Sequence, residues 1–74
     1  MPQNARKAVE LFRRGATAND ALCMFFLAQC YEGGTGVIAN PQIAKQWYVR
    51  SAEGGETRAI EWCERNGVKP KRID

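Results

Sequence analysis

"YEGGTGVIANPQIAKQWYVRSAEGG", residues 31–55, places a glycine-rich loop directly before a segment with helical periodicity. Such a loop can bind phosphate at the N-terminus of the following helix, or it can be the turn between two helices. A phosphate-binding loop of this kind follows a strand and carries a Lys-Ser or Lys-Thr pair, and this sequence has neither feature. The stretch therefore predicts a helical hairpin whose turn is residues 33–37.

Working outward from this hairpin, four segments have hydrophobic residues at helical spacing, and none alternates as a strand does. They are residues 4–14, residues 20–32, the segment between Asn40 and Gly54, and residues 56–65. The second segment is apolar nearly all round, which indicates burial on several sides. The pattern predicts an all-α fold of four helices joined by short turns.

Capping residues support these boundaries. Asn4 and Asn40 are the expected N-caps of the first and third helices, and Pro41 suits a first turn because its missing N–H costs nothing there. Gly15 and Asn19 are expected to interrupt the chain after the first helix.

The sequence also repeats itself with a period of 36 residues, which is typical of stacked helical units. Small residues align with small ones and bulky residues with bulky ones. The aligned pairs are Asn4 with Asn40, Ala8 with Ala44, Leu11 with Trp47, Phe12 with Tyr48, Ala16 with Ala52, and Phe26 with Trp62.

The unit from Asp20 to Gly55 resembles the Sel1-like repeat, a relative of the tetratricopeptide repeat. It departs from that pattern only mildly, with Ala28 in place of Gly, Asn40 in place of Asp and Ser51 in place of Ala. The matching signature residues, which the resemblance assigns to packing and turns, are Leu27, Tyr31, Gly34, Gly36, Val37, Asn40, Ala44, Trp47, Tyr48, Ala52 and Gly55.

The resemblance implies a short α/α solenoid of about four antiparallel helices, forming a single domain over residues 1–74. Residues 4–16 are then the second helix of a partial repeat, and residues 20–55 are a complete repeat. Residues 56–67 are a degenerate first helix or cap, and residues 68–74 are expected to be a flexible basic tail. The repeats of this family assemble protein complexes, often in bacteria and also in eukaryotic quality control. The resemblance therefore implies an adaptor or scaffold.

One stripe of the second helix is a candidate partner-binding site. Leu22, Phe26 and Gln29 lie at i, i+4 and i+7 on one helix face. In the resembled family these positions vary, are often polar and line the concave surface, whereas here two of them are large and apolar. The stripe predicts a groove for a partner's helix or extended segment, so a partner peptide or domain is expected to dock on the concave helix face. In the alternative, Phe26 packs against the fourth helix, on Trp62.

The first helix offers a candidate self-association surface around Val9, Leu11 and Phe12. In a full array this apolar side packs on a preceding helix. Homodimerisation through this face, or continuation of the array in a longer protein, would each cover it.

The three cysteines, Cys23, Cys30 and Cys63, are predicted to be buried and structural. With no histidine in the chain, three thiolates alone make a poor zinc site, so no metal or cofactor is expected. No nucleophile and base show a recognisable spacing, and we do not expect an enzyme.

The net charge of +3 is a mild basic bias. Arg6, Arg13, Arg14 and the tail "VKPKRID" allow an alternative in which a basic face associates with nucleic acid, but nucleic-acid binders usually carry denser basic stripes. No apolar run reaches the length of a membrane span, and no signal-peptide pattern is visible, so a cytoplasmic protein is expected.

Overall fold

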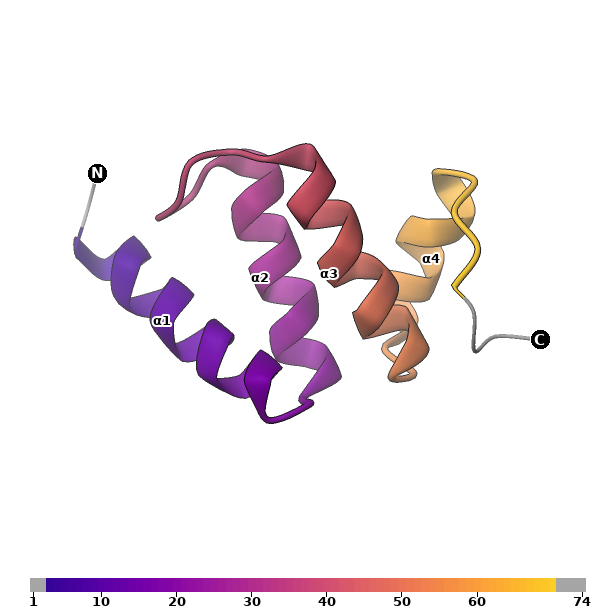
Figure 1. The fold of residues 1–74 in the computed structure, drawn as a ribbon, viewed down its shortest axis with the longest axis horizontal. Coiled ribbons are helices and arrows are strands. Elements are labelled where there is room, and N and C mark those ends of the chain that lie inside the picture. The colour runs from indigo at the N-terminus through magenta and orange to yellow at the C-terminus, as the bar shows by residue number, and fades with distance from the viewer. Residues whose placement is uncertain (1–2, 71–74) are drawn as a thin grey trace.

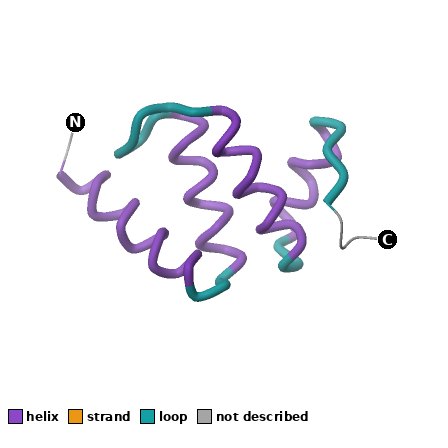
Figure 2. Tube along the Cα trace, viewed as in Figure 1, coloured by secondary structure: helices purple, strands orange, loops and turns teal. Residues whose placement is uncertain are grey.

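The computed structural model describes residues 3–70, which form four α-helices and contain no strand. They are α1 (Gln3–Thr17), α2 (Ala21–Gly33), α3 (Pro41–Glu53) and α4 (Thr57–Arg65). Each helix packs mainly on its neighbours in sequence, so that α1 and α4 lie at opposite ends of the array (Figure 1) and short loops join the helices (Figure 2). The prediction of an all-α helical array is confirmed. None of these helices is long and apolar enough to cross a membrane.

The start of α3 follows the sequence prediction. The side chain of Asn40 accepts hydrogen bonds of 3.1 Å from the N–H groups of Gln42 and Ile43, and Pro41 occupies the first turn. Asp20 caps α2 in the same way, accepting from Leu22 and Cys23. These caps satisfy backbone donors that the helices leave open, which fixes where α2 and α3 begin.

Two boundary predictions for α1 were wrong. Asn4 lies inside the helix rather than at its N-cap, because the helix already includes Gln3. Gly15 also lies inside α1, where a Cβ atom would collide with the side chain of Cys23, so this glycine brings α1 close to α2 rather than ending the helix. Asn19 does supply the break, with a left-handed φ of 67°.

The 36-residue period reappears in the hydrogen bonds of the turns after α1 and α3. Four backbone bonds close each turn, and each bond in the first has its counterpart 36 residues later. The donors are Ala18, Asn19 and Asp20 in the first turn and Gly54, Gly55 and Glu56 in the second, bonding to carbonyls of Arg14, Gly15 and Ala16 and of Arg50, Ser51 and Ala52. The chain therefore enters α2 and α4 by the same backbone path.

Two apolar clusters form the core, one on each side of α2. The first lies between α1 and α2, and the second joins α2, α3 and α4. Their buried members are Val9, Ala16, Met24, Leu27 and Cys30 in the first, and Phe25, Ala28, Ala44, Tyr48, Ala52, Ala59 and Cys63 in the second. The all-round apolar pattern of α2 thus has its explanation, because this helix is buried on both sides.

Five aromatic rings run from one end of the array to the other. Phe12 stacks on Phe26 with ring centroids 5.2 Å apart, and Tyr48 stacks on Trp62 at 4.0 Å. Phe25 connects the two stacks through edge contacts of 5.7 Å with Phe26 and with Tyr48. The two stacked pairs are equivalent under the 36-residue shift, so each marks the junction between successive repeats.

The glycine-rich loop contacts α1 as well as joining α2 to α3. Gly34 ends α2 in the left-handed conformation, and its N–H bonds to the carbonyl of Cys30. Gly36, at φ 74°, lies so close to α1 that a Cβ atom would come within 2.5 Å of the Ala5 carbonyl oxygen and 2.8 Å of a Val9 methyl. Val37 is half-buried against the cluster between α1 and α2. The loop is a structural turn, as the sequence predicted.

The segment after α4 is partly folded onto the core. The N–H of Val68 bonds to the Cys63 carbonyl at 2.8 Å, and its half-buried side chain packs on the cluster of α2, α3 and α4. Residues 71–74, the last four of the predicted tail, lie outside the described residues.

We predict that Gly36→Ala destabilises the fold more than Gly67→Ala. Both glycines have nearly the same left-handed φ, 74° and 67°, but a Cβ at Gly67 meets nothing within 4 Å. Gly67→Ala should therefore cost only the conformational term of about 1 kcal/mol, whereas Gly36→Ala adds overpacking and should cost about 2–4 kcal/mol. Urea unfolding of the two variants measures the difference, and equal losses would contradict the contact between the loop and α1.

Candidate partner-binding site

The carboxylate of Glu32 joins three helices beside the Tyr48–Trp62 stack. It accepts a hydrogen bond of 2.7 Å from the Tyr48 hydroxyl and one of 3.3 Å from the Trp62 indole N–H. Tyr48 is 1% exposed, and burial, reinforced by the bond to Glu32, raises the pKa of its phenol. The phenol therefore stays protonated and holds α3 to the end of α2.

The predicted stripe on α2 lies beside this core and is partly open. Leu22 is 40% exposed, Gln29 is exposed and Phe26 is half-buried. The alternative prediction placed Phe26 on Trp62, but these two rings do not stack on each other. Its ring stacks on Phe12 of α1, while Trp62 stacks on Tyr48. The reason is the order of packing, since α1 rather than α4 adjoins this side of α2.

The same stripe recurs on α4 with a different chemistry. A shift of 36 residues carries Leu22, Phe26 and Gln29 to Arg58, Trp62 and Arg65. Because the turns into α2 and α4 and the two ring stacks repeat with this period, equivalent positions lie on the same side of the array. We call these six residues the first-helix face. Its α2 half is largely apolar and its α4 half carries two exposed guanidinium groups.

The candidate self-association residues of α1 separate in the structure. Val9 is 3% exposed and belongs to the core, so it contributes nothing to an open surface. Phe12 is half-buried in its stack with Phe26. Leu11, at 63% exposed, is the apolar side chain of the three that solvent reaches most.

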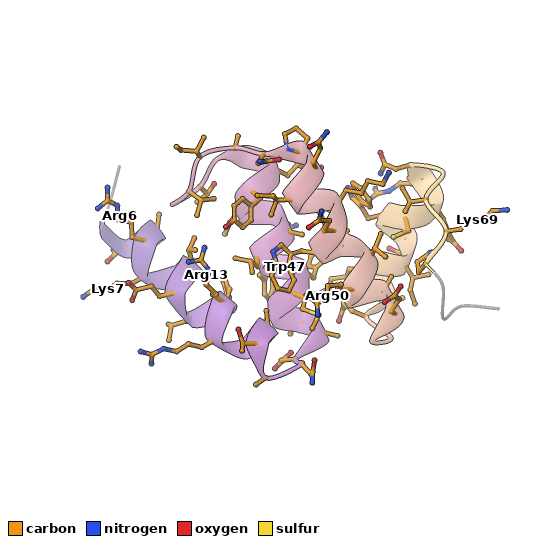
Figure 3. The ribbon with its side chains drawn as sticks, in the orientation of Figure 1. Arg6, Lys7, Arg13, Trp47, Arg50 and Lys69 are labelled. Atoms are coloured by element: carbon orange, nitrogen blue, oxygen red, sulfur yellow. The ribbon has the colours of Figure 1, made fainter. Side chains whose placement is uncertain are left out.

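The basic side chains are spread over the molecule. Arg6 and Lys7 lie at one end of the array and Lys69 at the other (Figure 3). Arg13 donates a hydrogen bond of 2.9 Å to the Tyr31 hydroxyl, and the guanidinium of Arg50 lies 5.2 Å from the centre of the Trp47 ring. Two of the arginines therefore contact signature aromatic residues.

The predicted burial of the cysteines holds for Cys30 and Cys63, whereas Cys23 is half-buried. All three thiols are free, with Cys30 and Cys63 buried, and burial raises the pKa of each thiol, which keeps it protonated. Among the described residues, no three Cys, Asp or Glu side chains form a cluster that could hold a metal ion.

Sequence reasoning missed two polar contacts that link helices. Glu32 looked like one of several scattered surface charges, and Ser51 like a mild departure from alanine. Ser51 is fully buried and donates a hydrogen bond of 2.6 Å to the carbonyl of Ala21, at the start of α2. In each contact the two bonded residues lie far apart in the sequence, so no local pattern indicates it.

The fold and its surface define a class of protein, a short array of α/α repeats with a mixed apolar and basic face. The profile of the Sel1 repeat matches residues 1–20 and 21–56, and the chain belongs to this family. The chain is 28% identical over 72 residues to chitin synthase regulatory factor 3 of Schizosaccharomyces pombe. The match covers 97% of this chain and 8% of that protein. No solved structure matches the chain.

We predict that Tyr48→Phe lowers the free energy of unfolding. We also expect this free energy to decrease less at alkaline pH in the variant than in the wild type. Loss of the bond to Glu32 should cost about 1–3 kcal/mol at neutral pH, because the acceptor is a carboxylate. In the wild type, the unfolded chain releases the phenol proton first, near its ordinary pKa of about 10. The stabilisation is thus complete below that pH and is lost as the pH rises above it.

Chemical unfolding at pH 8 and pH 11 measures this effect. The free energy of unfolding should fall more steeply between the two values in the wild type than in Tyr48→Phe. All other ionisable groups are the same in both proteins, so their contributions cancel in the comparison. An identical decrease in both would show that Tyr48 is not held neutral in the folded state.

Proposed function

We propose that this chain is a non-catalytic protein-interaction module, an adaptor or scaffold that docks a peptide segment of a partner on the first-helix face. The observation that carries this proposal is the exposed apolar position Leu22, beside half-buried Phe26, on a helix whose other sides are covered. Exposed apolar side chains on a rigid helix surface favour recognition of a peptide.

The two halves of the face indicate the chemistry of the partner. Leu22 and Phe26 suit an apolar anchor residue. Arg58 and Arg65 suit carboxylates that follow or precede that anchor, since guanidinium groups bind carboxylates through two parallel hydrogen bonds. The Arg58 side chain is 59% exposed, and its ion pair with Glu56, at 3.9 Å, is long. We therefore propose an acidic peptide with at least one large apolar side chain.

The comparisons support a partner that is a protein. The matching yeast protein is described as a regulatory factor of an enzyme, and regulation of that kind is consistent with docking onto another protein. Association with nucleic acid has less support, because Arg6 and Lys7 lie at the end of the array opposite Lys69 (Figure 3) and do not form one basic stripe with it.

Selection from a displayed library of random peptides tests the proposal. Peptides that bind the immobilised chain should combine a large apolar residue with Asp or Glu. Their affinities are then measured by fluorescence anisotropy against Leu22→Glu, Arg65→Glu and the control Gln46→Glu, which places the same charge on an exposed position of α3.

We predict that Leu22→Glu and Arg65→Glu each weaken binding about tenfold or more, which corresponds to roughly 1.4 kcal/mol. Gln46→Glu should leave the affinity unchanged. Enrichment of basic peptides, or an equal loss in the Gln46→Glu control, would contradict the first-helix face as the docking site.

A further inference from the structure

Tyr31 lies on the side of α2 that faces away from the first-helix face. It follows Leu22 by nine residues, which at 3.6 residues per turn places the two side chains on opposite sides of the helix. Tyr31 and Trp47 are both half-buried, and both pack against the two apolar clusters of the core. The surface that they border lies between α1 and α3, so it does not depend on what precedes or follows these helices in a longer array.

Each of these two rings is contacted by one arginine. The guanidinium of Arg13, on α1, donates a hydrogen bond of 2.9 Å to the Tyr31 hydroxyl. The guanidinium of Arg50, on α3, lies 5.2 Å from the centre of the Trp47 ring. In Figure 3, Trp47 lies between Arg13 and Arg50. Such contacts orient each guanidinium, and its other N–H groups stay available because arginine carries five donors.

This surface presents hydrogen-bond donors that have no acceptor among residues 3–70. The Tyr31 hydroxyl accepts from Arg13, so its own proton remains to be donated. The indole N–H of Trp47 is open to solvent, because no buried side-chain nitrogen in the described part of the chain lacks a partner. By contrast, the indole N–H of Trp62, on the first-helix face, donates to Glu32. Donors beside guanidinium groups suit an oxyanion.

The charge of α1 favours the Arg13 end of this surface as the place for the anion. α1 contains four basic residues and one acidic residue, so its net charge of +3 equals that of the whole chain. At the other end, Glu53 lines the same cleft as Arg50 and offsets its charge. The attraction for an anion is therefore stronger at Arg13.

We propose that Arg13 and Tyr31, beside Trp47, bind a phosphoryl group carried by a phosphorylated side chain of a partner protein. The Arg13 guanidinium binds the phosphoryl oxygens through charge-assisted hydrogen bonds, and the Tyr31 hydroxyl donates to the same group. A phosphoryl group carries more negative charge and more acceptor oxygens than a carboxylate, so it gains more from these donors. Arginine is the usual centre of sites that recognise phosphorylated segments.

A polynucleotide is a poorer match for this site. It presents a row of phosphates and binds through many cations, whereas this surface offers two guanidinium groups, one of them beside Glu53. The site is also separate from the first-helix face. A partner phosphorylated near its docking segment would contact both sides of α2 and bind with increased avidity.

Two-dimensional NMR of the nitrogen-15-labelled chain tests the proposal, because the chain has two tryptophans and one lies on each side of the array. Their indole N–H signals are assigned with Trp47→Phe. The probe is an acetylated pentapeptide of glycine with phosphoserine at its centre, and its controls carry serine or glutamate there. Arg13→Gln and Tyr31→Phe alter the site. Arg6→Gln is the matched control, because it removes the same charge from an exposed position of the same helix.

The phosphoserine peptide should shift the indole signal of Trp47 and leave that of Trp62 in place, and the serine peptide should shift neither. Arg13→Gln and Tyr31→Phe should each weaken binding about tenfold or more, because each loses a hydrogen bond to a charged group. Arg6→Gln should leave the affinity unchanged.

Four results would overturn the proposal. The Trp47 signal stays in place at every peptide concentration, or Arg6→Gln weakens binding as much as Arg13→Gln. Equal binding of the glutamate peptide would show a carboxylate site instead, and tighter binding of a single-stranded octathymidylate would show a nucleic-acid site. Leu22→Glu should not change the affinity for the phosphoserine peptide, so failure of this proposal and failure of docking on the first-helix face are separate results.

Discussion

The stack of Tyr48 on Trp62 is the contact on which the rest of the structure depends. The two rings lie 4.0 Å apart between centroids and only 13° from parallel, and they join the last helix to the complete repeat. Stacked aromatic pairs contribute about 0.5–1.5 kcal/mol beyond their buried area, which is a large share of the stability of a chain this small. Phe12 and Phe26 make the equivalent contact one repeat earlier.

Small residues make these stacks possible. Ala28, Ala44, Ala52 and Ala59 are buried almost completely, which lets the helix backbones approach closely around Tyr48. Glu32 then accepts the hydroxyl of Tyr48 and the indole N–H of Trp62, so the polar atoms of the two rings are satisfied at the core's edge. Each junction thus combines close helix packing with one large aromatic contact.

Much of this architecture could be predicted from the sequence, because it depends on local rules. The cap at Asn40, the left-handed residue at Asn19 and the period that aligns Phe26 with Trp62 are all visible in the residues themselves. The prediction was less successful where the answer depends on which side of a helix its neighbour occupies. Val9 and Leu11 look equally apolar, yet one is buried and the other is open, because α2 covers only one side of α1. Gly15 resembled a helix terminator and instead permits close packing on Cys23.

The surface separates into regions with different roles in our proposals. The ring stacks, which include Phe26 and Trp62, and the small residues hold the array, whereas the exposed members of the first-helix face are free to vary in our proposal. Leu22 and Arg65 are exposed members of that face.

A double-mutant cycle between Tyr48 and Trp62 tests the central claim most directly. The free energy of unfolding in urea is measured for Tyr48→Leu, Trp62→Leu and the double variant. If the stack joins α4 to the complete repeat, the two losses should be coupled by about 1 kcal/mol. Losses that add to within about 0.3 kcal/mol would show that the two rings stabilise the fold independently, and would contradict the account.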